Sequence, residues 1–235
     1  MNPQLPIAAR TYIAGISAAA AAAAIAVWGL HAAGAGLPAF LIVTALGALA
    51  HAYPIQGFRH QAYQVTLPFI ILAAAMFSAL ELIAFIVVMH IAEQLRVRRR
   101  LYIQWFNTCD YFISAATAAV LYQRAALLLP MSPIGRLTAA LAAACAFVLL
   151  NRLLLAGVLW LARRLSPAAS GLFQPELLAA DLVIAWVGAP MLVVALEAGA
   201  WTVLVTAGPL LLARPALAAL IGRRQPAARA QAPAA

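Results

Sequence analysis

The sequence predicts an all-α fold, namely a polytopic transmembrane bundle of about seven to eight membrane segments. Three observations predict this class. The 235 residues are 66% hydrophobic and only 9% charged, whereas soluble domains carry roughly 25% charged residues. Apolar runs recur along the chain, and about 20 apolar residues are enough to cross a bilayer. The basic residues are all arginine and cluster beside these runs, as in multi-pass membrane proteins.

Eight apolar segments follow one another along the chain. They fall at residues 11–30, 37–53, 65–78, 79–95, 106–123, 138–162, 177–197 and 201–221. The first is too long for the core of a signal peptide and lacks a convincing cleavage region, so we interpret it as a retained helix. Its seven consecutive alanines, Ala18 to Ala24, favour either close packing between helices or a docking face for another protein.

The stretch 65–95 is too long for one upright helix, yet each half of it is short for a full span. Pro68 and the stretch 78–81 permit a break, so we expect a helical hairpin or a re-entrant pair. A single span, which would leave seven segments, is the alternative.

Arginine placement predicts the orientation in the membrane. The cluster Arg96 to Arg100 belongs on the cytoplasmic side. We count the membrane segments in both directions from this cluster, with a hairpin at 65–95. Arg10 and the other strong arginine clusters then fall on the cytoplasmic side too. We therefore expect both termini in the cytoplasm. Residues 1–222 are expected to form the bundle, and residues 223–235, rich in Pro, Ala, Arg and Gln, a disordered cytoplasmic tail.

Polar residues inside the apolar runs are the candidate site. Arg152 and Asn151 lie near the middle of the segment 138–162, where a guanidinium costs at least a few kcal/mol unless it faces protein or water. By depth, Asp110 and Asp181 are its candidate counter-ions. Two interpretations stay open: a structural ion pair that holds the bundle together, or a pocket for an anionic or hydrogen-bonding headgroup.

Two further polar groups lie elsewhere. His51, Gln56 and His60 belong to the most polar loop of the chain, which would form either a ligand mouth or a wetted boundary between two helices. His90 and Glu93 share a helix face three residues apart, a spacing used in metal-carrying bundles. Because there is only one such pair, we expect no metal and no cofactor.

Composition and motifs narrow the function classes. The net charge of +9 does not indicate a nucleic-acid partner, because the arginines flank apolar runs. Metalloprotease, serine-hydrolase and phosphate-loop motifs are absent from the sequence, so an enzyme is not expected. The expected partners are the lipid bilayer and a second protein, in the membrane or the cytoplasm, with a small ligand as a further option.

Several short motifs from residue 52 onward are similar to a known membrane module. They are Val65 to Phe69 opening the pair, the Arg96 to Arg100 stretch, Trp105-Phe106-Asn107 opening a helix that ends at Tyr122, Phe147 to Arg152 in mid-helix, and Gly208 to Arg214. Together they resemble the N-terminal multi-helix sensory region of bacterial GGDEF and HD-type cyclic-di-GMP signalling proteins. The resemblance implies a sensory module in a bacterial cytoplasmic membrane.

In that family the last helix continues into a cytoplasmic effector domain, whereas this sequence ends shortly after Arg214. We therefore expect a stand-alone sensory or regulatory module that acts through a separate partner protein. Two alternatives remain. One is a small-solute uptake subunit resembling the substrate-binding component of energy-coupling-factor transporters, and the other is a structural accessory subunit of a larger membrane complex.

Overall fold

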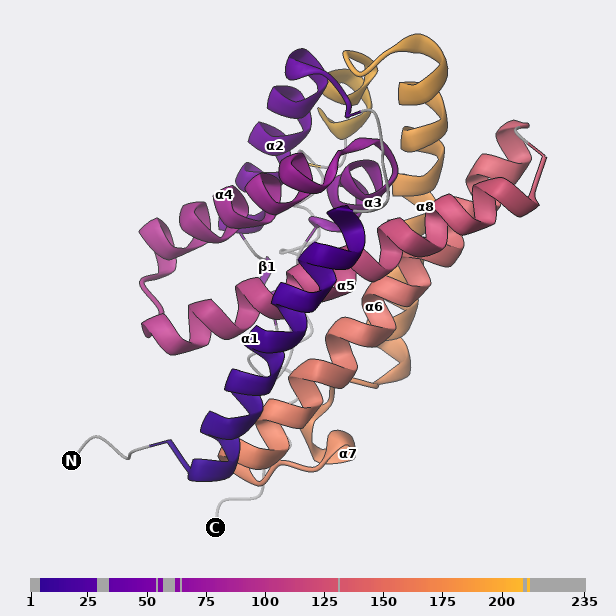
Figure 1. Ribbon diagram of the computed structural model, residues 1–235. Helices are drawn as coiled ribbons and strands as arrows, with labels where there is room; N and C mark the ends of the chain where they lie inside the picture. The colour runs from indigo at the N-terminus through magenta and orange to yellow at the C-terminus, as the bar shows by residue number, and fades with distance from the viewer. Residues whose placement is uncertain are drawn as a thin grey trace, which may run out of the picture.

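The computed structural model describes residues 5–28, 34–53, 65–130, 132–208 and 211, and the backbone of residues 55–56 and 62–63. This part of the chain is a helical bundle, as the sequence predicts (Figure 1). Its elements are α1 (Ile7–Trp28), α2 (Leu37–Ala52), β1 (Ile55–Gln56), β2 (Ala62–Tyr63), α3 (Leu67–Met76), α4 (Ala79–Val97), α5 (Leu101–Leu128), α6 (Pro133–Arg163), α7 (Pro167–Ser170) and α8 (Pro175–Ala198). The two strands form a short antiparallel ladder between α2 and α3. Residues 202–208 are also helical.

Four of these helices, α1, α5, α6 and α8, are each long and apolar enough to cross a membrane. The chain is therefore a membrane protein of the helical class. The helices α2 and α3 are apolar but shorter. The helix α4 has 19 residues and carries Glu81 and Glu93. Whether these three helices bring the total to seven or eight segments stays a prediction.

The helix α5 lies at the centre of the bundle, where it contacts α1, α3, α4 and α6. The short α3 is the most deeply buried element, because every residue from Leu67 to Ala74 is buried. It packs mainly on α8 and α5, whereas α4 packs mainly on α2. A close approach of backbones brings α8 onto α3, since a Cβ at Gly188 would lie 2.7 Å from the Cα of Pro68.

Helix α5 is longer at both ends than the predicted 106–123, and α6 begins before the predicted residue 138. The apolar pattern marks only the part of a helix that faces lipid or core. At the start of α6, the hydroxyl of Ser132 accepts a hydrogen bond from the backbone N–H of Gly135, and Pro133 occupies the first helical position. Capping chemistry therefore extends this helix beyond its apolar run.

The predicted break within 65–95 lies at Phe77–Ser78, between α3 and α4. Ser78 and Glu81 form a capping box that starts α4. The Oε2 atom of Glu81 accepts the backbone N–H of Ser78 at 2.8 Å and that of Ala35 at 3.2 Å. The break therefore lies beside the connection between α1 and α2.

The alanine run of α1 faces mostly away from the bundle. Ala20 is buried, whereas Ala18, Ala19, Ala21 and Ala22 are exposed. The expectation that this run packs closely within the chain therefore holds for one side of the helix only. The predicted tail 223–235 and most of the predicted segment 201–221 lie outside the described residues.

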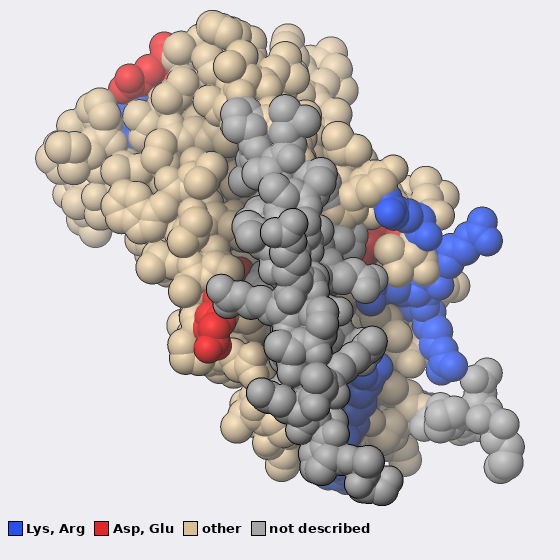
Figure 2. Space-filling model, turned by 180° about the vertical axis from the view of Figure 1, so that it is seen from behind, with Lys and Arg blue, Asp and Glu red and all other residues tan. Residues whose placement is uncertain are grey.

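Charged side chains are distributed unevenly over the surface. On the face seen in Figure 2, basic side chains gather on the lower and right-hand parts, and an acidic group with a basic neighbour lies at the upper edge. Arg136 at the start of α6 pairs with Glu197 at the end of α8 at 3.8 Å. These two helix ends therefore lie together at one end of the bundle.

Candidate functional site

Arg152 of α6 is buried, with 8% of its surface exposed, and its guanidinium faces α8 rather than the outside of the bundle. Its Nε donates to the Oδ2 atom of Asp181 at 3.0 Å, and its Nη2 pairs with the same oxygen. Further hydrogen bonds run to the backbone carbonyls of Leu172, just before α8, and Leu177, in its first turn. The guanidinium thus holds both the N-terminal part of α8 and the loop that leads into it.

The neighbouring residue in α6 makes a second contact to a different helix. The Nδ2 of Asn151 donates to the Oδ2 of Asp110 in α5 at 3.3 Å. The hydroxyl of Ser114, one turn later in α5, donates to the other carboxylate oxygen at 3.4 Å. Asp110 is buried, with 2% exposed, so these two donors replace part of the water that an ionised carboxylate would need.

The four residues predicted as one polar centre therefore form two pairs, Asn151–Asp110 and Arg152–Asp181, which we call the α6 bridge. Consecutive side chains of α6 contact α5 on one side and α8 on the other. Chemically, the bridge offers a cation and hydrogen-bond donors to any group that competes with the two carboxylates. A group that displaced Asp181 from Arg152 would remove one of the contacts that join α6 to α8.

The predicted loop site can be followed only at His51. His51 lies in the last turn of α2 and is 1% exposed, so it is a core residue rather than part of an open loop. The side chain of Gln56 and the whole of His60 lie outside the described residues. His51 lies within the segment predicted at 37–53, and the packing of α2 turns its side chain inward toward α4 and α5.

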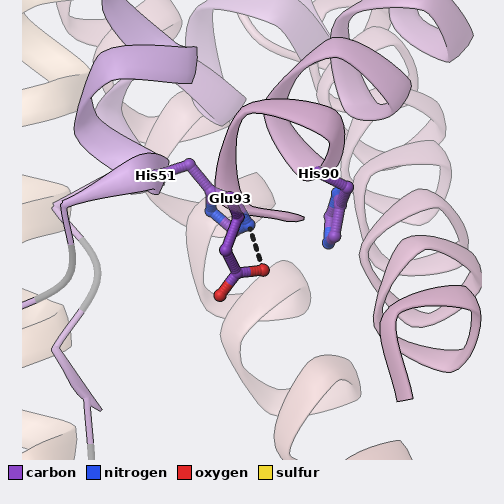
Figure 3. Close-up of side chains that lie close together, drawn as sticks. All are labelled: His51, His90 and Glu93. Carbon is purple, nitrogen blue, oxygen red and sulfur yellow. Dashed lines mark ion pairs between the residues drawn. The ribbon is translucent and has the colours of Figure 1, made fainter. Parts of the chain in front are cut away.

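His51 instead joins His90 and Glu93 in what we call the histidine cluster (Figure 3). The Nε2 of His51 lies 3.5 Å from the Oε2 of Glu93. His90, one turn before Glu93 in α4, lies with its ring tilted by 54° to that of His51, and the two ring centroids are 4.6 Å apart. All three side chains are at most 2% exposed. Potential ligand atoms, one from each residue, lie within 4.8 Å of one another.

The second oxygen of Glu93 faces the arginine-rich connection between α4 and α5. Arg99 donates to Oε1 from its Nε at 3.2 Å and from its Nη2 at 3.1 Å, and the Arg99 side chain is 34% exposed. Gln104 of α5 donates to Oε2 at 3.3 Å and to the carbonyl of His90 at 2.7 Å. The carboxylate thereby connects the buried cluster to a half-exposed arginine.

Tyr111 of α5 encloses the histidine cluster from the side of the core. Its ring centroid lies 5.1 Å from that of His51 and 5.0 Å from that of His90, in edge-on geometry. Phe147 of α6 packs behind it at 5.5 Å. The ring of Tyr111 therefore lies between the histidine cluster and α6.

Sequence reasoning placed His90 and Glu93 on one face but missed their contact with His51, Gln104 and Tyr111. The α5 residues do carry a signal, because Gln104 and Tyr111 stand seven residues apart and so share a helix face. No local spacing links His51 to α4, since the two lie on separate helices that meet only through packing.

The fold and its two buried polar groups define the class of this protein as a transmembrane helical bundle with an ionisable interior. Comparison with known proteins gave no match: no family model matches the chain, and no significant match was found among curated proteins or solved structures.

Proposed function

We propose that this chain is a multi-pass sensory or regulatory membrane module that acts through a separate partner protein. The observation that carries the proposal is the α6 bridge, in which adjacent residues of one apolar helix bind carboxylates on two different helices. Ionisable side chains inside a membrane bundle are costly and commonly mark functional sites. A purely structural core would hold these helices together with apolar side chains at no such cost.

The mechanism follows from the donors and acceptors of the bridge. Arg152 gives its hydrogen bonds to Asp181 and to two carbonyls near the start of α8. A ligand with an anionic or hydrogen-bonding group that bound Arg152 would compete with Asp181. Such a ligand binds better to the arrangement in which α8 is released, so it would shift the bundle toward that packing.

The outward face of α1 supports a protein partner. Four exposed alanines between Ala18 and Ala22 give this helix a smooth surface on the outside of the described bundle. Small side chains let a second membrane helix approach closely, which favours association by van der Waals contact. The resemblance to sensory regions of cyclic-di-GMP signalling proteins points to the same kind of role.

The contacts between helix ends favour the hairpin topology over a single span. Glu81 at the α3–α4 break bonds to Ala35, which precedes α2. His51 at the end of α2 lies beside Glu93 near the end of α4. The breakpoint and the α1–α2 connection therefore share one end of the bundle, and the ends of α2 and α4 share the other. With the arginine cluster in the cytoplasm, this arrangement also places the start of α1 there.

We propose eight membrane segments in a bacterial cytoplasmic membrane, with both termini in the cytoplasm. The helix α3 has only 10 residues, and at 1.5 Å per residue it covers roughly half of a bilayer core of about 30 Å. We interpret it as a short arm of the hairpin that does not span the bilayer core by itself, and the burial of Leu67 to Ala74 shields it from lipid.

The test is purification of the tagged chain from its native membranes in a mild detergent after chemical crosslinking. Three forms are compared: the unaltered chain, Arg152→Leu, and the matched control Arg136→Leu, which breaks an arginine–carboxylate pair at the half-exposed end of the same helix. We expect one stoichiometric partner with the unaltered chain and with the control. The Arg152→Leu variant should still insert into the membrane. The yield of partner recovered with it should differ from the yield recovered with the unaltered chain.

Failure to recover a reproducible partner with the unaltered chain would remove the mechanism. Equal behaviour of Arg152→Leu and Arg136→Leu would leave the partner in place but exclude the α6 bridge as the responsive site. Tight binding of a vitamin-sized solute by the purified chain would instead favour an uptake subunit.

A further inference from the structure

The histidine cluster holds more unsatisfied bonding capacity than any other buried group in the described part of the chain. The Nδ1 of His51 and the Nε2 of His90 have no hydrogen-bond partner, and the Nε2 of His51 has only the 3.5 Å ion-pair contact with Glu93. The three side chains are nevertheless almost completely buried. Buried polar atoms in native proteins are normally paired, so each exception calls for an explanation such as an ion.

The hydrogen bond of His90 fixes which of its nitrogens is available. Its Nδ1 lies 2.9 Å from the backbone carbonyl of Ile86, one turn earlier in α4. A carbonyl only accepts hydrogen bonds, so Nδ1 carries the proton and the neutral ring presents the lone pair of Nε2. Histidines that bind metals are usually held in this way, with the other ring nitrogen donating to a carbonyl or carboxylate.

Glu93 is oriented by the same kind of support. Its Oε1 is held by Arg99 and its Oε2 accepts from Gln104, which leaves Oε2 directed toward His51. Outer contacts of this type fix the direction of a ligating carboxylate. One potential ligand atom from each member of the cluster lies within 4.8 Å of those of the other two, and Figure 3 shows the ion pair between His51 and Glu93.

We propose that His51, His90 and Glu93 form a binding site for one divalent transition-metal ion of the zinc class. Two imidazoles and one carboxylate are a ligand set that such ions accept, with an open position left for water. Calcium and magnesium prefer several oxygen ligands, and this cluster offers one carboxylate. The inference does not depend on the proposed partner or on the α6 bridge.

The spacing of the cluster suits the ion after a small movement. Bonds of about 2.1 Å in tetrahedral geometry place neighbouring ligand atoms roughly 3.4 Å apart. The His51 and Glu93 atoms are already 3.5 Å apart, and the ligand atoms of all three residues lie within 4.8 Å. Binding therefore requires the ligand atoms that are farther apart than this to move closer together.

Entry is possible from the end of the bundle where α4 meets α5. Arg99 covers Glu93 from that side and is partly exposed, so its movement opens the carboxylate to water. Its positive charge disfavours a cation. An ion can offset this cost by binding the two histidine nitrogens as well as the carboxylate oxygen. Ions of the zinc class bind imidazole well, whereas calcium and magnesium do not.

The test uses the full chain purified in detergent with a tag that contains no histidine, freed of metal with a chelator. Zn²⁺ is titrated and the bound metal is measured after buffer exchange. Co²⁺ is titrated in parallel because its visible absorption reports both the number and the type of ligands. We expect one equivalent of either ion, a tetrahedral or five-coordinate cobalt spectrum, and a raised melting temperature with zinc.

Three single variants, His51→Gln, His90→Gln and Glu93→Gln, are each expected to abolish stoichiometric binding. The matched control Glu197→Gln removes a carboxylate that pairs with Arg136 at the opposite end of the bundle. This variant should still bind one equivalent of zinc. Circular dichroism of each variant checks that it is folded.

Absence of binding to the unaltered chain is decisive by itself, whether or not the variants fold. Less than about one-tenth of an equivalent of zinc at saturating concentration would overturn the proposal and assign the cluster to a buried His51–Glu93 ion pair. One equivalent that persists in folded His51→Gln and His90→Gln variants would overturn it as well, because the ion would then be bound elsewhere.

Discussion

At the scale of single residues, the burial of Arg152 decides how the interior of this bundle is organised. The guanidinium is satisfied by one carboxylate and two backbone carbonyls, all from the region of α8. Its neighbour Asn151 is used separately on α5. Sequence alone indicated that this arginine needs shelter from lipid, and the structure supplies the shelter from α8 and the loop before it.

Replacing Asp181 with leucine should destabilise the bundle strongly, because the buried guanidinium of Arg152 loses its counter-ion. Breaking a buried pair from one side costs about 3–5 kcal/mol. The double variant Arg152→Met/Asp181→Leu should recover most of that loss, since both charges are removed together. Unfolding by a denaturing detergent, followed by circular dichroism, measures the difference. A double variant as unstable as Asp181→Leu would show that the carbonyl contacts at Leu172 and Leu177 contribute more than the ion pair.

At the scale of helices, close contacts at glycine determine which elements meet. The short α3 is surrounded by other helices, and α8 approaches it at Gly188. The neighbouring atoms there belong to the backbone of Pro68 as well as to side chains, so they cannot move aside easily. By contrast, a Cβ at Gly15 in α1 would meet nothing within 4 Å.

Gly188→Ala should therefore destabilise the bundle by about 1–3 kcal/mol through overpacking between α3 and α8. Gly15→Ala, the control, should be neutral or slightly stabilising, because alanine has the higher helix propensity by up to about 1 kcal/mol. Thermal unfolding of both variants in the same detergent makes the comparison. Equal melting temperatures for the two variants would mean that the α3–α8 contact is looser than the structure indicates.

At the scale of the whole molecule, the arrangement of helix ends gives a topology that can be tested by cysteine labelling. In a background with Cys109 and Cys145 replaced by alanine, single cysteines are placed at Leu80 and Val97, which are 61% and 40% exposed. For the hairpin, an impermeant maleimide added to intact cells should label Leu80→Cys. It should label Val97→Cys only after the membrane is opened.

The helix α6 provides a control pair for that experiment. Leu128→Cys before it and Leu165→Cys after it should react from opposite sides, because α6 is long enough to cross the membrane. If Leu80→Cys is unreactive in both conditions while this pair behaves as expected, the single-span alternative with seven segments is favoured.

Much of the bundle could be predicted from the sequence because hydropathy and periodicity are local properties. In the described part of the chain, apolar runs marked the helices to within about five residues, and the Ser78–Glu81 stretch marked the break. Pro68, the other candidate for the break, instead occupies the first turn of α3. The ends of α5 and α6 were less accurate, since caps and polar turns extend a helix without adding to its apolar pattern. The burial of His51 was not predicted for a different reason, because the direction of its side chain depends on how α2 packs against α4.

The sequence by itself determined that this is a helical membrane protein and that Arg152 must lie against protein, because burying charge in lipid is too costly for any fold. Only the tertiary structure decided which carboxylate meets Arg152, and only it brought His51 to His90 and Glu93. These contacts join helices that are separate along the chain, and their geometry depends on how α2, α4, α5 and α8 pack together. No local pattern encodes that packing.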